Sequence, residues 1–509
     1  MNLAVLHYHL NRGGVTRVIE NHLASLDAVL DQPWRAALLF GGRREDFREE
    51  LPEQLGSIRL SLEEVPLLDY DDQQTSSTPT EPDALFAQLT ATLDRLEFVP
   101  RQTVLHFHNH ALGKNRCLPA VVPRLAEAGY AVLLQIHDFA EDFRPDNYRR
   151  IDPTAAGLYP QAPNVHYAVL NGRDEEILLA AGVARRQLHR LPNPVPAMAE
   201  LPARADARRR LAERFAVAED RRFVLYPVRC IRRKNVGEVL LYSALAPPDT
   251  VLGLTLPPLN PVEVPIYEGW KRLAAELDLP CAFEVGAPGG LTFAENLAAA
   301  DSILTTSLAE GFGMVFLESW LTGHPLLGRD LPEITRDFTE LGIRLDRLRP
   351  RLGVPVPWVG IDVFRRTIAD AYRRTLRAYG RDEPGDLAER IAARTADGLV
   401  DFGDLDESLQ EKVLRIVCGG EAPRRRLLEH NPWVEASLAI RGDEEAETIR
   451  HNAETITRHF SHVPSGRRLL ELYRRVSASP RRDRPQPLQH RERILDRFLD
   501  FDRFRPIRS

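Results

Sequence analysis

Short apolar runs alternate with amphipathic segments along the first third of the chain, and this alternation constrains the fold more than any other feature. Three segments between the runs, at 16–26, 84–96 and 118–129, carry apolar residues at helical spacing. Apolar strands separated by helices belong to parallel sheets that are covered on both faces. We therefore predict a doubly wound sheet of the α/β class. The strand-like runs are LAVLHY (3–8), WRAALLF (34–40), TVLHFHN (103–109), AVLLQIHD (131–138) and VHYAVLN (165–171).

The same alternation starts again after a linker near residues 192–220. A chain of 509 residues exceeds what one hydrophobic core supports, so two or three domains are expected. We predict a Rossmann-like N-terminal domain over 1–195 and a Rossmann-like C-terminal domain over 196–476. Ligands bind at the loops after parallel strands, so the domains should face an interdomain cleft. The later strand-like runs are RRFVLYPV (221–228), TVLGLTL (250–256), CAFEVG (281–286) and DSILTTS (301–307).

Two parts of the second half depart from this regularity. An arginine- and proline-rich stretch at 329–425 blurs the pattern and is interpreted as an insertion to which the sequence assigns no role. Residues 471–509 contain 11 Arg against 6 Asp plus Glu. Such a tail could contact nucleic acid or anionic lipid, but its interleaved acids favour a solvated helix. We expect residues 477–509 to be helical and to pack back on the N-terminal domain.

Composition excludes several classes of protein. The net charge of −6 is small for this length, which argues against nucleic acid and acidic membrane surfaces as partners. No stretch approaches the roughly 18 consecutive apolar residues of a membrane span, so no integral membrane association is expected. The N-terminus MNLAVLHYHL is interpreted as a first strand rather than a targeting segment, which favours the cytoplasm. The four cysteines are scattered and predict neither a disulfide framework nor a zinc site.

The segment SLAEGFGMVFLESW (307–320) places an acid, a flexible turn and a second acid directly after a predicted strand. Gly311 and Gly313 would let the backbone approach a ligand, and the helix expected over 313–323 would offer N–H groups to a phosphate. Glu310 and Glu318 could accept hydrogen bonds from two hydroxyl-bearing parts of one elongated ligand. The alternative is an ordinary turn followed by a solvated helix glutamate.

A second charged loop, YPVRCIRRKN (226–235), follows another predicted strand. Arg229 and Lys234 are suited to an anion, the first through a planar fork of donors and the second as a point charge. A solvated basic turn would explain any single arginine here. That alternative is weaker for Lys234, because only four of the 67 basic residues in the chain are lysines.

These two loops resemble motifs of one enzyme family. RCIRRKN is similar to the R-x4-K loop, and EGFGMVFLE to the E-x7-E motif, of retaining glycosyltransferases of the GT-B fold, family four. That family includes sucrose-phosphate, trehalose and glycogen synthases. The resemblance covers about residues 1–330 and a closing LLELYRR. Further segments occur in the family's order, namely NRGGVTRVIE (11–20), HFHNH, IHDF, LPNPV and LTGHP.

The resemblance implies roles for four charged residues. Arg229 and Lys234 would neutralise the diphosphate of the donor, including the charge that builds as the glycosidic bond breaks. Glu310 would hold hydroxyls of the donor sugar, and Glu318 the ribose of its nucleotide. These roles need positioning and electrostatic stabilisation rather than a covalent nucleophile.

The resemblance also implies roles for uncharged groups and for one histidine. The amides of Gly311, Phe312 and Gly313 would approach the sugar or the phosphates. His137, at a strand exit, would contact the donor sugar. The first-loop glycines, Gly13 and Gly14, would lie near the acceptor and the diphosphate.

The activity implied is transfer of a hexose from a UDP-, GDP- or ADP-linked sugar to an acceptor hydroxyl, giving an α-glycoside with no cofactor and no metal. A small soluble acceptor is favoured, and a lipid-linked or cell-wall acceptor stays open, as does a homo-oligomer. A nucleotide-sugar-binding regulatory or scaffolding protein without turnover is the alternative. Asn235 stands where glycine is more usual in the family, and the bulky Trp320 and Leu321 follow the second glutamate.

Two further patterns are interpreted as structural. His106, His108 and His110 alternate along one predicted strand at a spacing typical of metal ligands. We favour a packed or cleft-lining histidine ladder over metal binding. Thr292 and Glu295 form the pattern of a capping box, which predicts the start of a structural helix.

Overall fold

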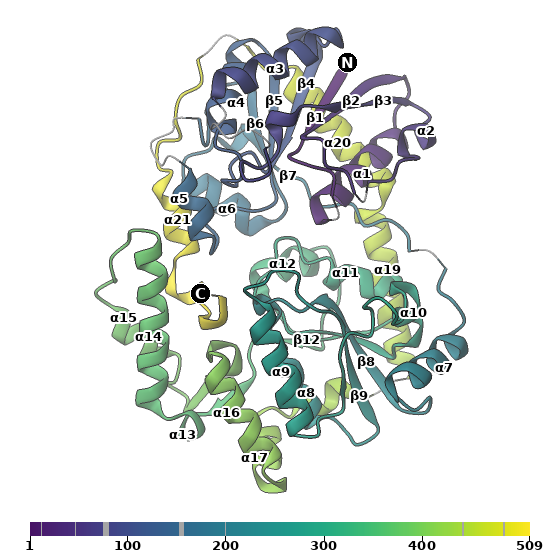
Figure 1. Cartoon of the computed structure of the whole chain (residues 1–509), viewed down its shortest axis with the longest axis vertical. Helices are drawn as coiled ribbons and strands as arrows, with labels where there is room; N and C mark the ends of the chain where they lie inside the picture. The colour runs from purple at the N-terminus through teal and green to yellow at the C-terminus, as the bar shows by residue number, and fades with distance from the viewer. Residues whose placement is uncertain are drawn as a thin grey trace. The chain divides into compact units, whose positions relative to one another are not determined.

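The computed structural model divides into two compact units, each with its own sheet (Figure 1). Unit 1 comprises Met1–Pro196 and Thr457–Asp500, and unit 2 comprises Ala197–Ile456 and Phe501–Ser509. The structure describes residues 1–11, 13–45, 47–74, 81–151, 157–198, 200–439, 442–481 and 484–508.

Unit 1 is built on a seven-stranded sheet in which every pairing is parallel. The strand order is β3-β2-β1-β4-β5-β6-β7, so the predicted doubly wound sheet is confirmed. The short β7 and the partly exposed edge strand β3 were not predicted, because neither forms a buried apolar run. The strands are β1 (Asn2–Leu6), β2 (Trp34–Phe40), β3 (Ile58–Glu64), β4 (Thr103–His108), β5 (Ala131–Ile136), β6 (Val165–Val169) and β7 (Leu188–Arg190).

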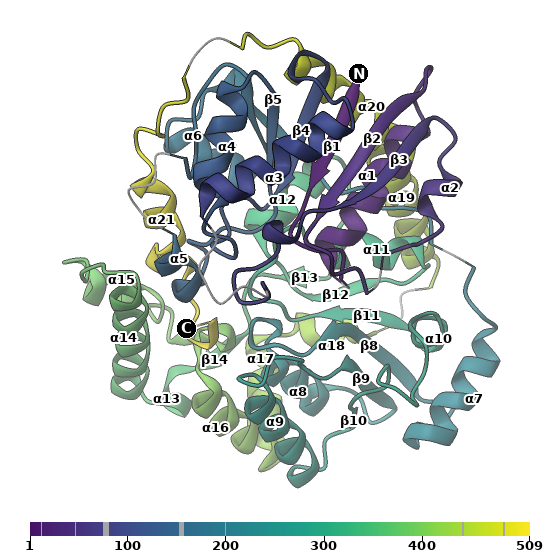
Figure 2. The same cartoon turned by 45° about the horizontal axis from the view of Figure 1, so that its top comes forward.

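Helices cover both faces of this sheet. The side chains of α1 and α20 pack on one face, and those of α3, α4, α6 and α21 pack on the other. In Figure 2, α3 and α4 lie in front of the strands and α20 lies behind them. The helices of unit 1 are α1 (Gly14–Asp27), α2 (Leu51–Gln54), α3 (Pro82–Arg95), α4 (Leu118–Glu127), α5 (Pro145–Arg150), α6 (Gly172–Ala180), α20 (His462–Ser477) and α21 (Glu492–Phe498).

Helix α20 differs from the predicted domain boundary, which placed all residues up to 476 in the second domain. Residues Thr457–Asp500 belong to unit 1, where α20 packs against α1. The approach is so close that a Cβ on Gly466 would lie 1.9 Å from the carbonyl oxygen of Ser25. Ser25 Oγ also lies 2.9 Å from His462 Nδ1. Helical periodicity shows that α20 has an apolar face, but it does not show which sheet that face covers.

The C-terminal tail is divided between the two units. Residues up to Asp500 belong to unit 1, where Arg493 donates to the carbonyl of Ala180 at 3.0 Å and Phe498 is fully buried. The last residues belong to unit 2, where Phe501 and Phe504 pack on Tyr372. The tail is therefore anchored to both units by buried apolar side chains, and it is helical only in part, over α21 and two short 3₁₀ turns.

Unit 2 repeats the doubly wound pattern with six parallel strands. Their order is β10-β9-β8-β11-β12-β13. The predicted capping box is confirmed at α10, where Thr292 Oγ1 accepts from the Glu295 amide at 3.2 Å. The strands are β8 (Arg222–Arg229), β9 (Thr250–Leu256), β10 (Cys281–Ala282), β11 (Ser302–Thr305), β12 (Leu326–Arg329) and β13 (Leu348–Arg349).

The segment 329–425 is regularly folded, which the sequence pattern did not show. Its first part carries α12 and β13 and so completes the parallel sheet, and its later part adds the antiparallel pair β14 (Gly353–Pro355) and β15 (Leu399–Asp401). Arg329 ties the two parts together, because its buried guanidinium donates to Glu238 at 3.0 Å and to Asp401 at 2.9 Å. The strands of this segment are only two or three residues long, so they form no apolar run that periodicity could identify.

The helices of unit 2 are α7 (Arg204–Phe215), α8 (Val236–Leu245), α9 (Val264–Glu276), α10 (Phe293–Ala299), α11 (Val315–Leu321), α12 (Pro332–Glu340), α13 (Val356–Val359), α14 (Ile361–Ala378), α15 (Leu387–Ala393), α16 (Glu407–Cys418), α17 (Glu421–His430) and α18 (Trp433–Leu438). Helix α19 (Asp443–Phe460) begins in unit 2 and ends in unit 1. Across the described residues, every helix is too short or too polar to cross a membrane.

Candidate functional site

The two predicted charged loops of unit 2 emerge from neighbouring strands. β8 and β11 pair in the centre of the sheet, and the strand order reverses between them. In open α/β sheets, ligands bind outside the carboxyl ends of the strands at such a reversal. Arg229 ends β8, and Glu310 lies five residues beyond the end of β11. The topology therefore brings both loops to the place where a ligand is expected.

Glu310 is the centre of a buried ionic cluster. Its carboxylate contacts the ammonium of Lys234, lies 3.0 Å from Arg233 Nη1 and accepts from Ser307 Oγ at 2.6 Å. The two motifs that the sequence singled out thus meet directly. Sequence reasoning missed Arg233 and Ser307. Arg233 stands directly before Lys234 in the sequence. The R-x4-K spacing singles out only Arg229 and Lys234, so Arg233 was overlooked.

The pKa values show how strongly this cluster is held. Burial raises the pKa of Glu310, but Lys234 and Arg233 outweigh it and lower the pKa to about 2. Burial lowers the pKa of Lys234, and the attraction of Glu310 only partly opposes this. With Arg233 and Lys234 charged, the two cations exceed the single carboxylate. The loop therefore offers a surplus positive charge, as an anionic ligand requires.

The loop that carries these cations is rigidly attached to the sheet. Thr306 Oγ1 donates to the carbonyl of Lys234 at 2.8 Å, and the Leu308 amide donates to the carbonyl of Arg233 at 2.9 Å. Arg229 Nη1 donates to the carbonyl of Pro257 at 2.8 Å. These bonds join the loop after β8 to the loops after β9 and β11.

Asn235 explains one departure from the family pattern. Its φ of +52° lies in the left-handed region that glycine adopts most easily and that asparagine tolerates. The side chain is buried, donates to Glu238 at 2.8 Å and accepts from Gln410 Nε2 at 2.9 Å. Asparagine therefore provides the turn and also anchors it to α8 and to α16.

The glycine turn after Glu310 is shaped by packing. Gly313 has φ +84°, and a Cβ there would lie 2.6 Å from the ring of Phe316. Phe312 is buried, and its ring lies edge-on to Phe338 with centroids 5.5 Å apart. The side chain of Phe312 is thus part of the core, so only its backbone would be available to a ligand. Gly311 is half-buried between Glu310 and this core residue.

Glu318 differs from Glu310 in having no ionic partner. Its carboxylate makes no hydrogen bond or ion pair with any described residue, and burial raises its pKa. It therefore offers lone pairs to a ligand at one end of the glycine turn. The helix that carries it, α11, spans only Val315–Leu321, shorter than the 313–323 expected. Because the dipole of so short a helix is small, the side-chain cations carry most of the attraction for an anion.

The predicted residues of unit 1 also lie at the carboxyl edge of their sheet. Gly13 and Gly14 follow β1 and begin α1, and both are exposed, whereas Arg12 between Asn11 and Gly13 lies outside the described residues. A Cβ on Gly14 would meet nothing within 4 Å. The glycines therefore leave open space at the first turn of a 14-residue helix, where backbone N–H groups attract anions.

His137 follows β5 and is held by the neighbouring strand. Its Nε2 lies 2.8 Å from His108 Nδ1, the two rings are stacked, and the residue is only 8% exposed. The His137 amide donates to Asn109 Oδ1 at 2.7 Å. Burial lowers the pKa of His137 to about 4, so the ring is neutral at pH 7. His110 does not join this pair, because its Nε2 lies 2.8 Å from the carbonyl of Leu158.

Known proteins with similar chains point to one enzyme class. No family model matches the sequence. The mannosylglucosyl-3-phosphoglycerate synthase of Petrotoga mobilis is 28% identical over 356 residues, which are 67% of each chain. Sucrose-phosphate synthase of Thermosynechococcus elongatus covers 94% of this chain and 99% of its own at 16% identity, with a TM-score of 0.53. The chain has the GT-B fold, and its similarity to the Petrotoga synthase supports glycosyltransferase activity.

A second solved structure agrees with this assignment. HepE of Anabaena in complex with UDP-glucose is 14% identical, with a TM-score of 0.51, and the match covers 93% of this chain and 99% of that one. At such low identity the likeness shows the fold alone. The predicted fold is confirmed by these structures, and the curated synthase supports the coarser prediction of a glycosyltransferase.

Proposed function

We propose that this glycosyltransferase moves a hexose from a nucleotide-diphosphate sugar to an acceptor hydroxyl with retention, giving an α-glycoside. The observation that carries the proposal is the cluster at the strand reversal of unit 2, where Lys234 and Arg233 hold Glu310 and keep a surplus positive charge. A diphosphate is the part of such a donor that needs this charge.

Donor binding would exchange the partners within the cluster. The phosphates would compete with Glu310 for Lys234, and Arg229 would add a second cation from the end of β8. Glu310 would then accept hydrogen bonds from hydroxyls of the sugar. The exchange keeps every buried charge paired, so binding would not leave Glu310 isolated in a low-dielectric site.

The second acid completes the donor site. Glu318 has an unengaged carboxylate with a raised pKa, and ribose hydroxyls would supply the donors that it needs. The backbone amides of Gly311, Phe312 and Gly313 would approach the sugar or the phosphates from the turn between the two acids. The roles expected of His137, Gly13 and Gly14 stay predictions, as do the cytoplasmic location and a homo-oligomer.

The proposed reaction breaks the bond between the anomeric carbon and the diphosphate oxygen and forms a bond from that carbon to the acceptor oxygen on the same face. The acceptor proton passes to the departing phosphate, so charge and atoms balance. Arg229 and Lys234 would stabilise the negative charge that develops on the leaving group. Removing a single preorganised group that stabilises charge in a transition state typically lowers kcat by about 10²–10³-fold.

A small, soluble and anionic acceptor is the best-supported choice. The name of the Petrotoga relative describes a synthase of a phosphoglycerate glycoside, and the name of the Thermosynechococcus protein describes a synthase of a sugar phosphate. We therefore propose a sugar or polyol acid as acceptor. A lipid-linked or cell-wall acceptor is the competing outcome of the test below.

The test measures nucleotide release from UDP-, GDP- and ADP-linked hexoses against acceptor panels of sugar acids, neutral sugars and lipid-linked sugars. Proton NMR of the product reports the anomeric configuration. Lys234→Ala and Glu318→Gln should each lower transfer by about 100-fold or more. Lys271→Ala is the matched control, because this half-buried lysine of unit 2 pairs with Glu268 and Glu284, which lie outside the cluster.

Three results would contradict the proposal. Full activity of Lys234→Ala would show that the donor site is assigned wrongly. An inverted product would refute retention. Donor binding without release across all acceptors would instead support a binding protein without turnover.

A further inference from the structure

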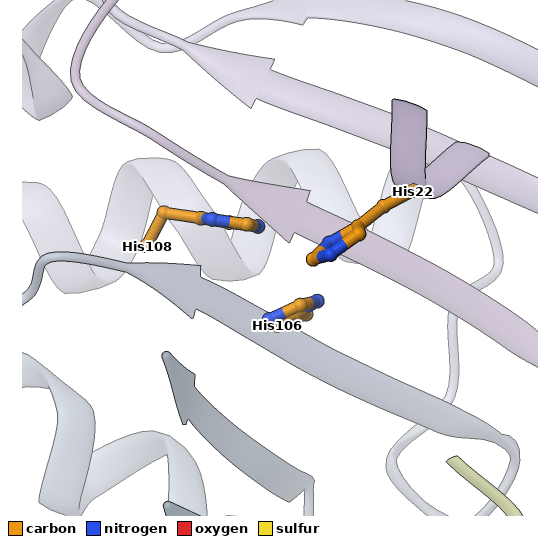
Figure 3. A group of neighbouring side chains, drawn as sticks. All are labelled: His22, His106 and His108. Carbon is orange, nitrogen blue, oxygen red and sulfur yellow. The ribbon is translucent and has the colours of Figure 1, made fainter. Parts of the chain in front are cut away.

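Three buried histidines of unit 1 converge on one point, and one of them, His108, also contacts His137. His22 comes from α1, and His106 and His108 come from β4 (Figure 3). Their exposed fractions are 4%, 0% and 2%. One ring nitrogen of each lies within 4.8 Å of the others. Sequence spacing could not reveal this group, because His22 lies on a different element and the alternating pattern suggested His110 instead.

The hydrogen bonds of these rings orient their nitrogens. His106 Nδ1 lies 2.9 Å from the hydroxyl of Tyr473, and His108 Nδ1 lies 2.8 Å from His137 Nε2. The Nε2 atoms of His106 and His108 and both nitrogens of His22 have no partner among the described residues. His106 and His108 match the usual arrangement of metal-ligating histidines, in which one nitrogen is bonded to a neighbouring group and the other is directed at the metal.

The unpartnered nitrogens border a small cavity. It has a volume of about 10 Å³ and is lined by the three histidines, by Tyr473 and by apolar residues of α1 and β1. This volume suits one water-sized particle. The remaining lining side chains are Leu3, Val5, Ile19, Leu23 and Leu26. Leaving such buried imidazole nitrogens without a partner destabilises the fold, so a ligand that accepts their lone pairs would be favoured here.

We propose that His22, His106 and His108 bind one Zn²⁺ ion in the small cavity between them. Zinc–nitrogen bonds of about 2.1 Å in tetrahedral geometry place the nitrogens about 3.4 Å apart, so the rings need to move inward by roughly 1 Å. Three neutral imidazoles favour zinc over magnesium or calcium, which take oxygen ligands. The ion would join α1 to β4 and, through His108, hold the ring of His137.

The test uses the full chain without a histidine tag, stripped with a chelator and then exposed to Zn²⁺ alone. The wild-type protein should retain about one zinc per chain after gel filtration, and zinc should raise its Tm. Co²⁺ should give the visible absorption bands of a tetrahedral nitrogen site. His22→Leu should lose the ion and the Tm shift yet remain folded, because leucine fits the apolar wall and adds no buried polar group of its own.

The controls separate the cluster from other histidines. His189→Gln alters a stacked pair with His166 in the same unit and should leave zinc binding unchanged. If His22→Leu does not fold, His106→Gln provides the second variant. Equal zinc content in His22→Leu and His189→Gln would overturn the proposal. So would a wild-type chain that binds no zinc while His22→Leu gains stability, because a single buried water would then explain the cavity.

Discussion

Replacing Glu310 by glutamine is the sharpest test of the ionic cluster, because it removes the charge and keeps the shape. The glutamate side chain is only 10% exposed, and its ion pairs with Lys234 and Arg233 lower its pKa from an ordinary 4.5 to about 2. A carboxylate whose pKa falls on folding stabilises the protein above pH 4.5. That stabilisation is lost as the pH falls toward 2.

The magnitude follows from this shift. At about 1.4 kcal/mol per pH unit, the change from 4.5 to about 2 corresponds to roughly 3 kcal/mol. This is an upper limit, because the lowered pKa of Lys234 shows that burying the ammonium offsets part of the gain. For a domain of this size, 3 kcal/mol corresponds to a fall in Tm of roughly 6 °C.

The assay is calorimetric unfolding of the wild-type protein and Glu310→Gln between pH 7 and pH 3. The Tm of the variant should be lower by up to about 6 °C at pH 7. This difference should narrow below pH 4.5, because Glu310 of the unfolded wild-type chain then binds a proton that the folded protein does not bind until the pH nears 2. Glu411→Gln is the control, since this glutamate is 45% exposed and pairs at the surface with Arg415. A difference in Tm that stays constant from pH 7 to pH 3 would contradict the ion pairing of Glu310.

Three further predictions follow from residues outside this cluster. Arg329→Met should lower the free energy of unfolding by about 3–5 kcal/mol in urea titrations, because it leaves two buried carboxylates without their cation. Arg351 is more exposed, so Arg351→Met should lower the free energy of unfolding by less than about 1 kcal/mol. Gly313→Ala should lower both Tm and kcat/KM more than Gly323→Ala, since both have positive φ but only Gly313 is crowded; equal losses would contradict this. Burial raises the pKa of Glu141 to about 7, which destabilises the fold as the pH rises from 4.5 through 7. Glu141→Gln should therefore raise Tm more at pH 8 than at pH 5, and a uniform change would count against the buried acid.

The residues of the candidate site were largely predictable from local sequence. Glu310, Glu318, Arg229 and Lys234 each follow a strand that its apolar run identifies, so their place at the carboxyl edge of a sheet needs no tertiary information. The types and spacing of these charged residues also resemble the motifs of a known glycosyltransferase family. Arg233 was not predicted as part of the site, because spacing alone does not tell which of several adjacent cations turns toward the acid.

Contacts between residues far apart in the chain could not be predicted from the sequence. His22 and Tyr473 are distant from His106 in the chain, and only the packing of α1 and α20 on the same face of the sheet brings them together. The assignment of α20 to unit 1 rests on the same contact, made close by Gly466.

The sequence by itself determined most strands of the two parallel sheets, the doubly wound class and the charged loops, because hydrophobic periodicity reports which face of an element is buried. Only the tertiary structure decided what each buried face meets. It paired Glu310 with two cations and brought His22 to the histidines of β4. The physical reason is that periodicity is a local property, whereas ion pairing and ligand convergence depend on distances between elements far apart in the chain.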